Sequence, residues 1–315
     1  MIGAVAGSYF IPDTILPRVS ESTDEQEMET KYSYINPLLF CKDQNLSNLN
    51  SEVSTEIEKK VGTYIEERKK EGGLIEASVY YKDLNSGPWA LINGELLSAP
   101  SSLLKVPLAI SVYSAAEKNP SLLGTSVHFS GGEDVPASQY FKPPQQIVAG
   151  SNYTAEELVR YMVEDSDNAA LYLLSNMLDQ KDLLDSYSHL GITTPTTNLS
   201  SYSMTVRQYA SFFRILFNAS YLSQDKSEYL LSLLASSKFD QGIEAGLPKD
   251  IKVANKFGET RFSNNKVQLH DCGIVYYKKG PYLLCIMTHG TNFDALAGSI
   301  AGISKIIYAV LEEQN

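Results

Sequence analysis

The sequence predicts an α+β fold, a five-stranded antiparallel sheet packed with helices and joined to an all-helical subdomain. Three observations predict it. Two short strand-like runs lie near the start of the chain, three more lie near its end, and the stretch between them has mainly the pattern of helices. A sheet built from both ends of the chain satisfies this order. The chain has 315 residues, 43% of them apolar and 20% charged, which is ordinary for a globular protein with a sizeable core.

The first twelve residues, MIGAVAGSYFIP, are apolar but too short to span a bilayer, which takes about 20 residues. They lack the basic start of a full signal peptide. Two interpretations stay open, a tail or edge strand and the trailing end of a signal or anchor helix. Residues 13–50 form a polar, irregular lead-in, within which YSYINPLLFC is expected to lie against the body of the protein. We therefore divide the chain into a lead-in, 1–50, and one domain, 51–315, with its helical subdomain at about 117–240.

A helix is predicted over 53–70, followed by a β-hairpin. Apolar residues recur there at the helical period: Val53, Ile57, Val61, Tyr64 and Ile65. Thr55 and Glu58 have the spacing of a capping box at its start. The runs LIEASVYYKD and PWALINGE flank the turn signal LNSG and are typical of two paired strands.

The central part of the chain is predicted to be helical. A loop turns into a buried helix over about 102–116, and residues 120–150, rich in Gly, Pro and Ser, are expected to be loops. Thr154 and Glu157 form a second capping box, which opens two helices broken near Asp165. The segments TVRQYASFFRILFNASYL and SEYLLSLLASS indicate further helices.

The last part of the chain returns to strands. IKVANKFGE, VQLHDCGIVYYKK and PYLLCIMTHG are predicted strands, and KKGP marks the turn between the last two. An amphipathic helix over about 293–312 closes the chain, and no segment other than the N-terminus is expected to meet a membrane.

The composition of the chain argues against several classes of protein. The net charge of −11 argues against a nucleic-acid binder, which usually carries a basic patch. The four histidines have no close ligand spacing, so we expect neither a dedicated metal site nor a cofactor. Cys272 and Cys285 lie in apolar strand-like runs, and we interpret them as small buried side chains rather than as a disulfide.

Three short motifs follow one another along the chain. The first is Ser102 with Lys105 in SSLLK, the second is S-D-N at Ser166 to Asn168, and the third is Lys256 to Gly258 in NKFGE. Each alone has a plain structural explanation: a helix start, a helix break with its cap, and an edge strand with a glycine. In this order they resemble the S-x-x-K, S-D-N and K-T-G motifs of class A β-lactamases and penicillin-binding proteins, over about residues 53–315.

That resemblance implies a β-lactamase/transpeptidase-like fold and a role for each motif. Ser102 would be the nucleophile and Lys105 its base, which requires a lowered lysine pKa. Lys256 would supply a second positive charge, and Ser166 would pass a proton to the leaving nitrogen. Asn168 would hold an amide of the substrate.

The third motif would complete the site. Gly258 would let the substrate backbone lie against the strand. The oxyanion hole would consist of the backbone N–H groups of Ser102 and Glu259.

Two departures from the family pattern matter. Phe257 replaces the usual Thr or Ser, whose hydroxyl helps to bind the substrate carboxylate; Thr260 is a candidate substitute. The water-activating glutamate of class A enzymes has no counterpart in residues 189–208, HLGITTPTTNLSSYSMTVRQ, which contain neither Glu nor Asp. Glu164 and Asp165 could be considered instead, and we expect Glu164 to be helical and solvated. We therefore expect acylation with slow release of the acyl group.

The predicted function is a serine hydrolase that acts on β-lactams or on D-alanyl-D-alanine-type cell-wall peptides outside the cytoplasm, secreted or anchored through the N-terminus. An alternative is a non-enzymatic extracellular interaction module that keeps the fold. A third is an esterase that uses the same serine on small esters.

Overall fold

The computed structural model describes residues 31–36, 52–85, 87–131, 139–179, 181, 187–188 and 202–313. The chain divides into two units, Met1–Ser33 and Tyr34–Asn315, and every element named below belongs to the second. Residues 1–12 and the boundary predicted at residue 50 lie outside the described residues. The end of the lead-in does contact the body: the Ile35 and Asn36 N–H groups donate to Glu228 Oε2 (3.0 Å) and the Phe217 carbonyl (2.8 Å).

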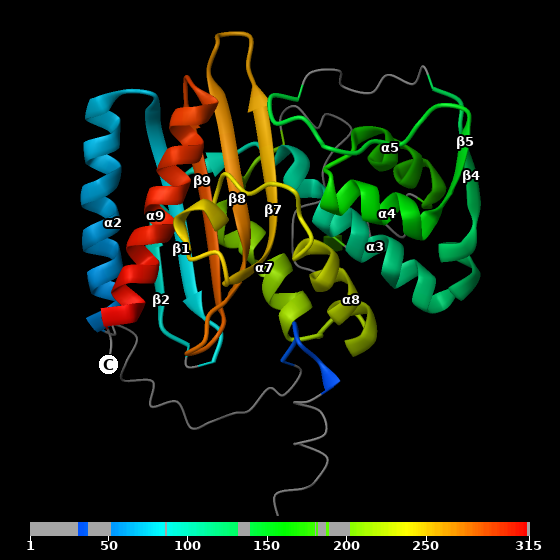
Figure 1. Ribbon diagram of the computed structural model, residues 1–315, viewed down its shortest axis with the longest axis horizontal. Coiled ribbons are helices and arrows are strands. Elements are labelled where there is room, and N and C mark those ends of the chain that lie inside the picture. The colour runs from blue at the N-terminus through cyan, green and yellow to red at the C-terminus, as the bar shows by residue number, and fades with distance from the viewer. Residues whose placement is uncertain are drawn as a thin grey trace, which may run out of the picture. The chain divides into compact units, whose positions relative to one another are not determined.

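A five-stranded antiparallel sheet has the strand order β2-β1-β9-β8-β7 (Figure 1). Its strands are β1 (Leu74–Asp83), β2 (Trp89–Ile92), β7 (Lys252–Arg261), β8 (Val267–Tyr276) and β9 (Tyr282–Gly290). β9 pairs with β1, so the hairpin near the start joins the three strands near the end. The predicted α+β fold is confirmed. β7 is the last strand in this order, and its outer edge faces the helical part of the chain.

Two long helices, α2 (Glu52–Glu71) and α9 (Phe293–Glu313), lie side by side on one face of the sheet (Figure 1). Their apolar stripes are buried there, as the helical period predicts. By length and composition α9 could cross a membrane, which the sequence analysis did not expect, but it packs as a core helix. The prediction of a capping box at Thr55 is wrong, because α2 already begins at Glu52. The carboxylate of Glu58 instead accepts a hydrogen bond from the Leu91 N–H at 3.2 Å.

Further helices complete the described part of the chain, and most of them lie beside β7 (Figure 1). They are α3 (Lys105–Lys118), α4 (Ala155–Glu164), α5 (Asn168–Met177), α7 (Val206–Phe217) and α8 (Gln224–Leu234), with the 3₁₀ turns η2 (Ser101–Leu104), η3 (Pro120–Gly124) and η5 (Glu244–Gly246). α7 packs against β1, β8 and β9. The capping box of Thr154 and Glu157 is confirmed, since both of its hydrogen bonds are present at the start of α4.

Four short strands were not predicted. β3 (Leu97–Ser98) pairs with β6 (Met204–Thr205). β4 (Ser126–Phe129) lies inside the region 120–150 that was expected to be loops, and it pairs with β5 (Ser151–Thr154), just after that region. They are two to four residues long, which is too short for an alternating apolar pattern to reveal them in the sequence.

Cys272 and Cys285 are bonded as a disulfide, so the prediction that they are separate buried side chains is wrong. The two residues stand directly opposite each other in the β8–β9 register, with their Cα atoms 3.9 Å apart. Their apolar surroundings correctly indicated burial. The pairing depends on the register of two strands, which neither strand shows by itself.

Candidate active site

The first motif sits where a loop turns into a core helix. Ser102 lies in the 3₁₀ turn η2, and Lys105 is the first residue of α3. This helix is apolar almost all round, so its first turn is carried into the interior and takes Lys105 with it. Lys105 is fully buried while Ser102 stays partly exposed. Lys105 Nζ lies 3.1 Å from Ser102 Oγ, which places an amine from the interior against the hydroxyl of a partly exposed residue.

The second motif lies in the turn between α4 and α5. Asp167 holds this turn: it caps α5 by accepting the Ala170 N–H (2.9 Å), and its other oxygen accepts the Ile147 N–H (2.9 Å). Ser166 has a backbone φ of +59°, a left-handed conformation that costs a non-glycine residue energy. The turn presents both the carbonyl and the hydroxyl of Ser166 to Lys105, whose Nζ lies 2.6 Å and 3.0 Å from them.

The third motif brings a second buried lysine to the same hydroxyl. Lys256, on β7, donates to Ser166 Oγ (2.9 Å) and to the Phe257 carbonyl (3.0 Å). When both lysines donate, they occupy the two lone pairs of Ser166 Oγ, and the hydroxyl proton of Ser166 is free to be donated to a third group. The structure thus brings Ser102, Lys105, Ser166 and Lys256 into one cluster.

The electrostatics of the cluster favour a neutral Lys105. Burial lowers the pKa of Lys105 well below its ordinary value, and the neighbouring charge of Lys256 lowers it further. Burial also lowers the pKa of Lys256, to about 7, against the opposing pull of Asp271 and Glu259.

The acceptors around Lys105 orient its lone pair. The amine lies 2.7 Å from Asn168 Oδ1 and 2.6 Å from the Ser166 carbonyl, and these oxygens can only accept hydrogen bonds. In neutral Lys105 they take the two N–H bonds, so the lone pair is left for a hydroxyl. Ser102 Oγ is one of the two hydroxyls within reach. An amine held in this way can take the proton of Ser102.

Gly258 allows β7 to approach the segment that carries Ser102 closely. A Cβ atom on Gly258 would lie 2.7 Å from the Pro100 carbonyl oxygen and 3.0 Å from the Leu103 N. These atoms flank Ser102 in η2. Gly258 was predicted to let the substrate backbone lie against the strand, and the structure adds a close contact within the protein.

We expect Gly258→Ala to lower the rate of Ser102 acylation by about 10²-fold, because a displacement on the order of 1 Å at a reacting group can have that effect. The added methyl group meets backbone atoms, which cannot turn aside as a flexible side chain can. Rate measurements on wild type and variant test this, with Gly298→Ala as the control because a Cβ there meets nothing within 4 Å. Equal rates would show that η2 moves away without loss.

Two side chains of β8 hold the segment that leads to Ser102, and sequence reasoning missed both. Ala99 donates its N–H to Gln268 Oε1 (3.0 Å), and its carbonyl lies 3.1 Å from His270 Nε2. The Thr288 N–H donates to His270 Nδ1 (3.3 Å), so Nε2 carries the proton of a neutral ring. Burial lowers the pKa of His270 to about 3, in agreement with that tautomer. Residues two apart in a strand share a face, so the sequence could indicate that Gln268 and His270 point the same way. It could not indicate that Ala99 lies opposite them.

The residues after Lys256 separate onto the two faces of β7. Thr260 shares a face with Gly258, whereas Phe257 lies on the other face, stacked on Phe239 at 4.2 Å between ring centroids. The Thr260 hydroxyl therefore lies on the opposite face of β7 from the Phe257 ring and does not take the position of the missing hydroxyl. Glu259 has an unexpected contact: its carboxylate accepts the Tyr140 N–H at 2.8 Å.

The candidates for a water-activating carboxylate are only partly accessible. Glu164 ends α4 as expected but is half-buried rather than solvated, and burial raises its pKa. Asp165 is buried and accepts the Gln145 N–H at 3.2 Å. Residues 189–201 lie outside the described part of the chain.

Comparison with known proteins gives a consistent result. The beta-lactamase enzyme family matches residues 56–311. A beta-lactamase of Streptomyces albus G is 24% identical over 279 residues, which cover 79% of this chain and 86% of that protein.

Solved structures share the fold. A class A beta-lactamase from Bacteroides cellulosilyticus superposes with a TM-score of 0.70 at 18% identity, covering 84% of this chain and 100% of the other. An acyl-enzyme complex of a PBP-A mutant with penicillin G superposes with a TM-score of 0.66 at 19% identity, covering 82% and 97%.

Proposed function

The chain belongs to the beta-lactamase enzyme family, and from that premise we propose that it is a serine acyl transferase that forms an acyl-enzyme on Ser102. The substrates are β-lactams or D-alanyl-D-alanine-type peptides. One observation carries the proposal: a buried amine of lowered pKa lies 3.1 Å from the hydroxyl of a partly exposed serine.

Each proton transfer in the proposed reaction is assigned to one residue of the cluster. Neutral Lys105 takes the proton of Ser102 Oγ as that oxygen bonds to the substrate carbonyl carbon. The C–N bond then breaks, the leaving nitrogen takes the proton of Ser166, and Ser166 recovers one from Lys105, which lies 3.0 Å away. The backbone N–H groups of Ser102 and Glu259 stabilise the oxyanion. The amide nitrogen of Asn168 serves the substrate, since its oxygen faces Lys105.

Release of the acyl group is the slow step in this proposal. Residues 189–208 contain no carboxylate, and Asp165 is buried and occupied by the Gln145 N–H. Loss of a general base for water lowers a rate by roughly 10²- to 10⁴-fold. The PBP-A mutant whose structure is known as a penicillin G acyl-enzyme offers a precedent on the same fold.

We place the protein outside the cytoplasm, secreted or anchored through its N-terminus. The Cys272–Cys285 disulfide supports this location, because disulfides persist mainly in oxidising compartments. The alternative of a non-enzymatic interaction module is not favoured, since such a module has no use for two buried lysines held on one serine.

The mass of the intact protein after mixing with penicillin G tests the proposal. We expect a covalent adduct that persists, while Ser102→Ala stays unmodified and Ser101→Ala, its neighbour in the same turn, behaves as wild type. Penicillin consumed without a lasting adduct would show fast release and contradict the slow step. An unchanged protein with intact penicillin, and with D-alanyl esters also intact, would favour the interaction module.

A further inference from the structure

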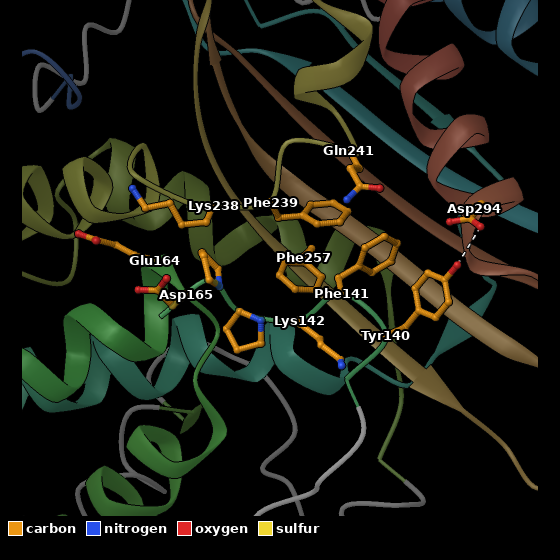
Figure 2. A pocket seen from close by; sticks show the side chains of 12 residues that line it. Tyr140, Phe141, Lys142, Glu164, Asp165, Lys238, Phe239, Gln241, Phe257 and Asp294 are labelled. Carbon is orange, nitrogen blue, oxygen red and sulfur yellow. Dashed lines mark hydrogen bonds between the residues drawn. The ribbon is translucent and has the colours of Figure 1, made fainter. Parts of the chain in front are cut away.

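A pocket of about 340 Å³ adjoins the cluster, and none of the steps above uses it (Figure 2). Two residues that line it are chain neighbours of the site: Asp165 precedes Ser166, and Phe257 follows Lys256. Lys256 Nζ lies 2.9 Å from Ser166 Oγ and 4.2 Å from the centroid of the Phe257 ring, so this wall of the pocket lies close to the hydroxyl proposed to protonate the leaving group. The pocket is therefore placed to receive the leaving group, and this inference rests on the proposed function.

One side of the pocket is aromatic. Phe239 and Phe257 are stacked with ring centroids 4.2 Å apart, and Phe141 meets them edge-on at 5.0 Å and 6.1 Å. All three line the pocket, and Figure 2 shows their rings gathered together. Such a surface favours apolar groups, because their transfer from water onto it removes apolar area from solvent.

The nearest cation is not open to an anion in this pocket. Lys256 is fully buried and donates to Ser166 Oγ and to the Phe257 carbonyl. The Phe257 ring itself lies over the ammonium group, with Nζ 4.2 Å from the ring centroid. A carboxylate entering from the pocket side would meet this ring and not the charge behind it.

The charges around the pocket also disfavour an anion. Glu164 and Asp165 line the side opposite the rings, and Glu259 lies on the same face of β7 as Phe257. Two exposed lysines, Lys142 and Lys238, also line the pocket, but Figure 2 shows their ammonium groups extending away from the rings. The loop N–H groups of Tyr140 and Phe141 are already taken by the Glu259 carboxylate.

We propose that this pocket selects substrates whose leaving group is uncharged and apolar, such as a D-alanyl ester or amide with a blocked C-terminus, over those whose leaving group ends in a free carboxylate. Phe257 and Glu259 determine this preference. An anion here would lose its hydration and face the carboxylates around the pocket, while the Lys256 ammonium group stays behind the Phe257 ring.

Two esters that differ in one group test the proposal: N-acetyl-D-alanyl-D-lactate and its carboxamide. Acylation of Ser102 is followed by intact mass and by release of the leaving group. Wild type is expected to react about 10-fold or more faster with the carboxamide. In Glu259→Gln and in Phe257→Thr the carboxylate ester should gain several-fold relative to the carboxamide. Phe262→Thr, on the exposed turn after β7, should leave the ratio unchanged.

The outcomes separate this inference from the proposed function. Equal rates in wild type, or a faster carboxylate ester, overturn the preference while leaving acyl transfer in place. A preference that both variants leave unchanged overturns the assignment to Phe257 and Glu259. Since Phe257→Thr removes a buried ring and could unfold the protein, Glu259→Gln, at a half-buried position, decides in that case. Failure of both esters and of penicillin G to modify Ser102 overturns the proposed function itself.

Discussion

Replacement of Lys105 by Met should lower the rate of Ser102 acylation by about 10³- to 10⁴-fold, the upper part of the range that positioned proton transfer supplies. Methionine has a similar length and fits the buried position, but it cannot take the proton of Ser102. Lys105 contacts four oxygens of the site, from Ser102, Ser166 and Asn168. Stopped-flow release of the leaving group from the D-lactamide ester, together with intact mass, measures the effect.

The loss must be separated from misfolding. Lys118→Met is the matched control, because Lys118 lies at the exposed end of the same helix, α3. Thermal unfolding of both variants shows whether the fold survives. Methionine has no polar group to remove from water at this buried position, but the replacement leaves the Ser166 carbonyl and Asn168 Oδ1 without the donor they have in wild type. A folded Lys105→Met protein that acylates within about 10-fold of wild type would exclude Lys105 as the base.

Much of the fold was predictable because its signals are local. The five strands and the two long helices on the sheet carry their own period of two or 3.6 residues, so their existence and order follow from the chain. The boundary errors also have local causes. Ser102 lies in a 3₁₀ turn and not in the helix predicted to start there, since the helix proper begins at the buried Lys105.

The cluster was predictable as a set, but its surroundings were not. Three motifs in order indicated that Ser102, Lys105, Ser166 and Lys256 meet, and the resemblance supplied the reason. The hydrogen bonds of Gln268 and His270 to Ala99 form because one face of β8 packs against the loop that contains Ala99. Contacts across the fold of this kind leave no trace in the spacing of residues along one segment.

The aromatic pocket shows the same limit at a functional position. Phe257 was recognised as a departure from the motif, and only its removal of a hydroxyl could be inferred. The structure adds what takes its place, a stack on Phe239 that covers the Lys256 ammonium group. The motif alone shows which group is missing at position 257, whereas the contacts of the Phe257 ring are known only from the structure.

Replacement of Lys256 by Met should change the pH dependence of acylation as well as its rate. In wild type the rate should rise with pH as Lys105 loses its proton, and fall again near pH 7 as Lys256 loses its own. The charge of Lys256 lowers the pKa of Lys105, so its removal raises that pKa and moves the rising limb to higher pH. The falling limb should disappear, and the rate at neutral pH should drop by about 10²- to 10³-fold.

This pattern distinguishes an electrostatic role from a purely structural one. Loss of packing alone would lower the rate at every pH and leave the midpoints in place, whereas loss of the charge must move them. Lys252→Met, four residues earlier on the same strand and exposed, should keep the bell shape and the wild-type rate. A Lys256→Met profile parallel to that of wild type would mean that the two lysines do not act on each other. Ser166 would still connect them, because its hydroxyl lies 3.0 Å from Lys105 Nζ and 2.9 Å from Lys256 Nζ.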